Sequence, residues 1–370
     1  MNKKVTLKPI TPKTIYFPST DEFSQFLDIG TSARSKANTM SKLLGCDLNI
    51  SNRSLDNLGS VGIKEKTARK AGWPILRFMS QTGLLRYFKE IPKKISKNEV
   101  FYAWIMPLKG FKHANKNINL DCLHVFFEHR NELYQPIKQC IDSSPKLTAD
   151  NQTELLTSFY QLALSKTLLT EEEQSELCRV IASGDIEGKA TENTRRFVQY
   201  WTYDFHLSLM VALDLTMLYN ADKVDKYNCG IFGHIFMKEG ATYFSQFLNH
   251  FNDINGFNDY QLARFIPIKR ESDHEHTTSL HEAQSNTLKK WRSGKTKPET
   301  ETITRFFENV DSEAYTLPIV LVATLCLALD RQLENVKDSL WEDGFLATFS
   351  AKRYETYFKH FKKKLPELAA

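Results

Sequence analysis

Residues 285–298 of this 370-residue chain constrain its local fold more tightly than any other stretch. Leu288 and Trp291 lie three positions apart, so a helix through them turns both side chains toward the same side. The positions between and around them are polar or basic, which is typical of a helix with one face in solvent. Gly294 suits the left-handed residue that ends many helices, and Pro298 is common just beyond such an end. The sequence therefore predicts a surface helix that buries these two side chains.

The neighbouring sequence predicts three further helices that share a core with this one. Asn258 is a good N-cap for a short helix, and the small side chain of Ala263 suits a close helix crossing. The apolar residues expected to face this core are Phe244, Phe247, Leu248, Leu262, Ala263, Ile303, Phe306 and Phe307. Their spacing of three and four positions is that of one helical face.

Two runs in this region, residues 256–266 and 285–298, resemble the second helix and the recognition helix of lambda-repressor-like helix-turn-helix domains. The resemblance covers roughly residues 241–310. It implies a unit that places a few side chains in the major groove of double-stranded DNA. By this resemblance the base-reading positions are Ser285, Asn286 and Lys290, which we expect to be exposed. The phosphate-binding positions, again by resemblance, are Gln284, Thr287, Lys295 and Lys297.

The spacing of the two runs departs from the family pattern. Leu262 and Trp291 are 29 positions apart, whereas the family pattern has about 14. We expect the inserted residues 267–283 to form an exposed, mobile loop, because they contain few apolar side chains. Their three histidines lack the spacing of a known metal motif, so we expect no metal there.

A second feature is the uneven distribution of charge. Residues 61–116 carry thirteen Lys and Arg against three Glu, with aromatic residues between them. Such a composition is typical of a surface that follows nucleic-acid phosphates and stacks on bases. Lys93, Lys94 and Lys97 are our candidates for this secondary nucleic-acid surface. The alternative is a packed domain with aromatic side chains inside and lysines in solvent, and the pattern alone does not separate the two.

Catalytic patterns are few. Arg270 and His276 resemble the Arg–His signature of HEPN-type ribonucleases, in which such a pair serves phosphodiester cleavage. An α-helical ribonuclease is therefore one alternative function, and a protein-interaction scaffold is another. The chain contains no Walker loop, dinucleotide-binding glycine motif or nucleophile elbow, so the sequence indicates no cofactor.

The six cysteines are irregularly spaced and contain no CxxC pair, which favours free thiols in the reducing cytoplasm. The apolar segments 205–219 and 317–329 are too short to suggest membrane spans, so we interpret them as buried helices.

We expect a mainly α, multi-domain helical protein that contains a helix-turn-helix unit. Its expected parts are a basic domain over 1–145, helical residues 146–240, the DNA-binding unit over 241–310, and C-terminal helices over 311–370. The expected partner is double-stranded DNA, with a homodimer or protein partners left open. The expected role is a sequence-specific transcriptional regulator or the DNA-targeting subunit of a mobile-element or defence system.

Overall fold

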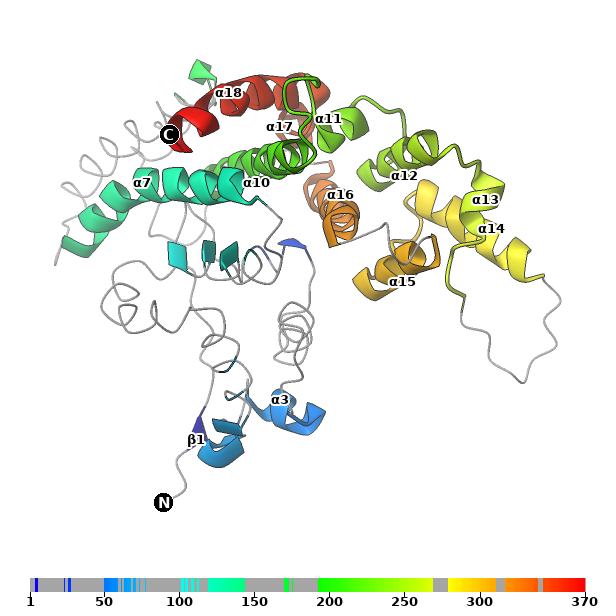
Figure 1. Ribbon diagram of the computed structural model, residues 1–370, viewed down its shortest axis with the longest axis horizontal. Helices are drawn as coiled ribbons and strands as arrows, with labels where there is room; N and C mark the ends of the chain where they lie inside the picture. Colours follow the sequence, from blue (N-terminus) through cyan, green and yellow to red (C-terminus); the bar gives the residue numbers. More distant parts are fainter. Residues whose placement is uncertain are drawn as a thin grey trace. The chain divides into compact units, whose positions relative to one another are not determined.

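The computed structural model of this chain is mainly helical, which confirms the expected mainly α class (Figure 1). It describes residues 119–143, 192–268, 279–310, 317–338 and 342–369 without interruption, together with shorter stretches between residues 4 and 175. Among these residues the strands are β1 (Lys4–Val5) and β2 (Ile63–Lys64). They pair antiparallel, with Lys4 opposite Lys64.

The chain divides into two compact units. The first contains Met1–Lys226 and Lys359–Ala370, and the second contains Tyr227–Phe358. Helix α18 (Ala351–Ala369) contributes residues to both. The four-part division drawn from the sequence stays a prediction.

The first unit is built around two long helices, α7 (Asp121–Ser143) and α10 (Glu192–Asn220), which pack against each other. The shorter α3 (Asn52–Leu58) lies earlier in the chain. Phe126 and Phe205 are fully buried between the long helices, with ring centroids 5.8 Å apart. Beside them, Arg130 of α7 and Asp204 of α10 form a buried ion pair at 2.6 Å. This arrangement confirms the expected buried helix at the first apolar segment.

Within the described residues, the second unit contains seven whole helices and the start of α18, and it includes the candidate DNA-binding region. In chain order they are α11 (Ile231–Phe236), α12 (Tyr243–Asn255), α13 (Asp259–Ala263), α14 (Leu280–Arg292), α15 (Thr300–Val310), α16 (Leu317–Val336) and α17 (Glu342–Thr348). Helix α12 contacts α11, α14 and α16, while α13 contacts α14 and α15 contacts α16. Figure 1 shows α14 beside α13, on the far side of α12 from α16. The apolar α16 is buried, as expected for the second apolar segment.

The N-terminus of α12 is held by a buried carboxylate from α16. The Asp330 oxygens accept hydrogen bonds from the backbone N–H groups of Tyr243 at 2.6 Å and Phe244 at 3.0 Å. These two donors have no partner within their own helix, so Asp330 satisfies them from outside. Burial raises the pKa of Asp330 to about 6, although the two N–H donors and the Lys297 charge act in the opposite direction. Thr242 adds the usual side-chain cap by accepting from Ser245 N–H at 3.0 Å.

None of the described helices is both long enough and apolar enough to cross a lipid bilayer.

Candidate nucleic-acid interface

Helix α14 has the amphipathic structure that its sequence predicts. Leu288 and Trp291 are buried, with 2% and 4% of their surfaces exposed. The Trp291 ring packs edge-on against Phe244 of α12 and Phe306 of α15, with centroids 6.1 and 6.0 Å apart. The helix begins at the N-cap Ser279, whose hydroxyl oxygen accepts from Glu282 N–H at 3.1 Å. Its inward face is therefore anchored in the core shared by α12 and α15.

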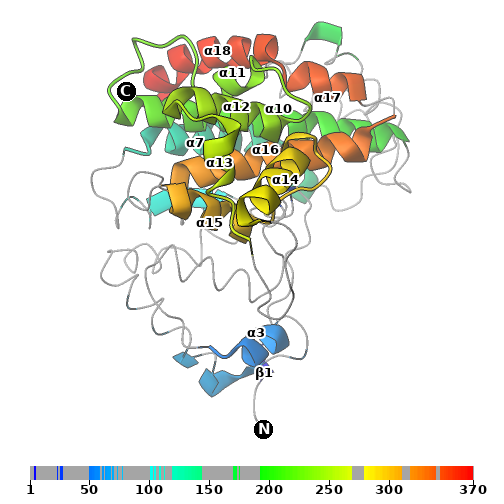
Figure 2. The ribbon, with the colours of Figure 1, turned by 90° about the vertical axis from the view of Figure 1, so that its right-hand side faces the viewer.

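The exposed residues of α14 from Glu282 to Lys290 are all polar, whereas Leu280 in its first turn is an exposed apolar side chain. Asn286, Lys289 and Lys290 are exposed, as is Glu282 one turn before Asn286. Figure 2 views this side of the unit and shows α14 in the foreground, with no other described helix in front of it. The expected exposure of Asn286 and Lys290 is confirmed. Ser285 was also expected to be exposed, but it is half-buried at the edge of the face, toward α13. This face presents amide, ammonium and carboxylate groups together.

Helix α13 is short, and its N-terminus has a complete cap. Asn258 caps it by accepting from Gln261 N–H at 2.9 Å, and the Gln261 side chain accepts from Asn258 N–H at 2.9 Å. This reciprocal pair is a capping box, and it confirms the expected N-cap. Leu262 and Ala263 are fully buried, as their spacing predicts.

Gln284 joins α13 to α14, which corrects its expected phosphate-binding role. Its side chain is 8% exposed, and its amide nitrogen donates to the backbone oxygens of Arg264 and Ile266, both at 3.0 Å. The two carbonyls lie at and just after the end of α13, where helices leave acceptors unpaired. Gln284 is thus inside the unit, where phosphate does not reach. The signal was present in the sequence, since Gln284, Leu288 and Trp291 follow the spacing of one helical face.

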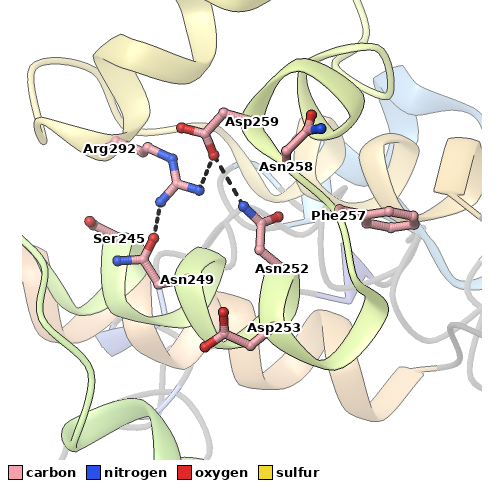
Figure 3. Close-up of a pocket in the computed structure, with 8 residues that line it drawn as sticks. All are labelled: Ser245, Asn249, Asn252, Asp253, Phe257, Asn258, Asp259 and Arg292. Atoms are coloured by element: carbon pink, nitrogen blue, oxygen red, sulfur yellow. Dashed lines mark hydrogen bonds and ion pairs between the residues drawn. The ribbon is translucent and has the colours of Figure 1, made fainter.

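Arg292, at the end of α14, fixes the other end of the helix. Its guanidinium donates to Asn249 of α12 and to the carboxylate of Asp259, the latter at 2.5 Å. Asn252 of α12 donates to the same carboxylate at 3.1 Å. Figure 3 shows these groups in an open polar pocket between α12, α13 and α14, with Arg292 reaching into it from above. The sequence did not predict these contacts of Arg292, because no pattern in it indicates that Asn249 and Asp259 lie close to Arg292.

The exit turn after α14 packs closely on the start of α12. Gly294 has a φ of +71°, which confirms the expected left-handed residue. A Cβ at this position would meet the Thr242 methyl group at 2.7 Å, so the turn has no room for a side chain. Lys295 is exposed, as a phosphate-binding residue requires. Lys297 instead forms an ion pair with Glu334 of α16 and faces the interior, which corrects its expected role.

The Thr287 hydroxyl donates to Ala283 O at 2.9 Å and is half-buried on the flank of α14. The candidates outside the described residues are Lys93, Lys94, Lys97, Arg270 and His276. The expected loop over 267–283 is wrong at its C-terminal end, because 280–283 form the first turn of α14. The Ser279 cap and the bonds of Gln284 stabilise that turn, which composition alone did not reveal.

The polar groups behind α12 include a stacked pair of histidines. The rings of His234 and His250 lie 5.4 Å apart, and His234 Nε2 is 3.4 Å from the Cys229 sulfur. Burial, followed by the nearby His234 and Lys238, lowers the pKa of His250 to about 4. Within the described part of the chain, no three His, Cys, Asp or Glu side chains are grouped so as to hold a metal ion.

Comparison with protein-family models, curated proteins and solved structures found no match for this chain. The resemblance to helix-turn-helix domains therefore rests on residues 256–266 and 285–298 of the sequence.

Proposed function

We propose that this protein binds double-stranded DNA by placing the exposed face of α14 in the major groove. The groove of B-form DNA is about 12 Å wide and admits an α-helix. The observation that carries the proposal is a helix whose exposed residues from Glu282 to Lys290 are all polar, while its inward face is anchored in a core and Gln284 and Arg292 fix it to its neighbours. A reading helix needs this rigidity, because a base contact depends on exact placement of the side chain.

The proposed roles follow from the chemistry of each exposed side chain. Asn286 can form two hydrogen bonds with adenine, and Lys290 can reach the acceptors of guanine. Lys289 and Lys295 are exposed, and we assign them to phosphate contacts, which position the helix without reading sequence. Ser285 remains a base-reading candidate at the edge of the face. Gln284 and Lys297 leave the proposed surface because their side chains face the interior.

The first experiment measures the salt dependence of binding to a random-sequence duplex by fluorescence anisotropy. Each phosphate contact contributes about 0.9 to the slope of log K against log salt. Replacing both Lys289 and Lys295 with Gln should therefore lower the magnitude of the slope by up to about 1.8, because both are assigned to phosphate contacts. The matched control replaces Lys337 and Lys352, which are exposed elsewhere in the second unit, with Gln. Equal changes in the two double variants, or no binding by the wild type, would contradict the proposal.

We also propose that residues 61–116 contact the nucleic-acid backbone. The charge excess supports this, and so does Trp73, which is 69% exposed and therefore available for stacking. Reversing the charges of Lys93, Lys94 and Lys97 should flatten the same salt slope, and an unchanged slope would favour the packed-domain alternative. The proposed role is a sequence-specific regulator, or the DNA-targeting subunit of a mobile-element or defence system, in the cytoplasm.

A further inference from the structure

The side chain of His281 connects α13 to the edge of the α14 face. Its ring lies on the ring of Tyr260, with centroids 4.0 Å apart, and its Nε2 is 3.1 Å from the Tyr260 backbone oxygen. A carbonyl oxygen only accepts hydrogen bonds, so Nε2 must carry the proton. This contact fixes the tautomer of the neutral imidazole and leaves a lone pair on Nδ1.

That lone pair determines the direction in which the Ser285 hydroxyl donates its hydrogen. Ser285 Oγ lies 3.3 Å from His281 Nδ1. Because Nδ1 has no hydrogen in this tautomer, the serine hydroxyl must donate to it. The hydrogen of Ser285 is then directed toward the histidine, and only the oxygen lone pairs remain for a ligand. His281 thus makes Ser285 an acceptor.

Glu282 places a second acceptor in the same half of the helix. It is exposed, and its carboxylate has acceptor atoms only. It lies one turn before Asn286 on the outward face, whereas Lys289 and Lys290, one turn after Asn286, have donor atoms only. The exposed face of α14 is therefore divided, with acceptors in its N-terminal half and donors in its C-terminal half.

We infer that this division sets the sequence preference of the proposed DNA-binding surface. The N-terminal half of α14 selects bases with an amino group in the major groove, which are cytosine and adenine. The C-terminal half selects guanine, which offers two acceptors there. His281 acts as a positioning residue by orienting the Ser285 hydroxyl. The inference rests on the proposed function, and it adds which bases the surface selects.

The geometry also gives the spacing of these preferences. Glu282 and Lys290 are eight residues apart, which corresponds to about 12 Å along the helix axis at 1.5 Å per residue. At 3.4 Å per base pair this covers about three to four base pairs. Selection of tight-binding duplexes from a random pool should thus return cytosine or adenine at one end of a short motif and guanine about three to four base pairs away.

The variants of Ser285 and His281 test the orientation of the hydroxyl. Ser285→Ala should reduce the preference for an amino-bearing base by about three- to tenfold at one position, the value of one hydrogen bond. His281→Phe keeps a ring against Tyr260 but frees the hydroxyl to donate, so it should relax the preference at that same position. His281→Asp again offers acceptors only, and should restore the preference even if the added charge weakens binding to every duplex.

The Glu282 carboxylate is tested by Glu282→Gln, which adds a donor and should relax the preference at the neighbouring base. The matched control is Glu308→Gln, which removes the same charge from an exposed position of α15 and should leave the selected motif unchanged. An equal loss of affinity for all duplexes in His281→Phe would mean a purely structural role and would overturn the inference. So would wild-type protein that binds DNA but selects no motif, or a motif without this polarity, while the proposed function would stand. Wild-type protein that binds no duplex would overturn both.

Discussion

The buried carboxylate of Asp330 should make the stability of the second unit depend on pH in an unusual direction. Most native carboxylates have lowered pKa values, so stability usually falls in acid. Burial has the opposite effect here, and raises the pKa of Asp330 to about 6 from an ordinary value of about 4. The folded protein then binds this proton more tightly than the unfolded chain does. The favourable contribution of Asp330 is fully present below about pH 4 and is lost as the pH rises to about 6.

The magnitude follows from this change in pKa. An increase from about 4 to about 6 corresponds to about 3 kcal/mol of unfolding free energy. Asp330→Asn removes the titration but leaves one acceptor oxygen for the two N–H groups of Tyr243 and Phe244. The second N–H then faces an amide NH2 group, at a cost of about 1–3 kcal/mol for an unsatisfied buried donor. The variant should thus be less stable than wild type at pH 4, and the difference should close or reverse by pH 7.

The assay is urea unfolding of both proteins between pH 4 and 7, monitored by circular dichroism. Other titrating groups are common to the two proteins, so the difference in unfolding free energy isolates Asp330. We expect this difference to move by about 3 kcal/mol in favour of the variant across the range. A difference that is constant with pH, or that moves in favour of wild type as the pH rises, would refute this account of the buried carboxylate.

The packing and the proposed interface each predict the effect of single substitutions. Leu288→Ala should lower the free energy of unfolding by about 2–5 kcal/mol, measured in urea. Leu346→Ala, at a partly exposed position, should lower it much less. Equal losses in the two variants would contradict the packing described for α14. Asp204→Ala leaves the Arg130 charge buried without its partner carboxylate, and should cost about 3–5 kcal/mol; a thermal midpoint close to that of wild type would contradict this. Asn286→Ala should cost about 1–3 kcal/mol on a selected duplex and little on random DNA when titrated by anisotropy, and equal losses on the two would show that Asn286 reads no base.

The features predicted correctly from the sequence are those that short-range patterns determine. The burial of Leu288 and Trp291, the cap at Asn258 and the left-handed Gly294 each depend on residues within one or two helical turns. The mainly helical fold follows from the same periodicity. The helix-turn-helix assignment stays a proposal.

The features that were missed depend on pairs of residues far apart in the chain. Lysine is usually a surface residue, but the Lys297 side chain is largely covered and forms an ion pair with Glu334 of α16. Arg292 reaches Asn249, 43 positions earlier. Periodicity indicates which side of a helix faces inward, but it does not identify the polar partner that another helix contributes on that side. Only the tertiary arrangement brings these partners together.

The separation of α13 from α14 has a consequence for how such units are recognised. Sixteen residues, 264–279, join the two helices, and each doubling of a flexible connection costs only about 0.6 kcal/mol of closure entropy. The hydrogen bonds of Gln284 and Arg292 offset a cost of that size, since each contributes about 1 kcal/mol or more. By this balance the polar contacts between the helices, and not the length of the connection, determine how α13 packs on α14. A pattern written as contacts between helices, with no fixed spacing, would describe this pair of helices, whereas a pattern that requires about 14 positions between the two runs does not.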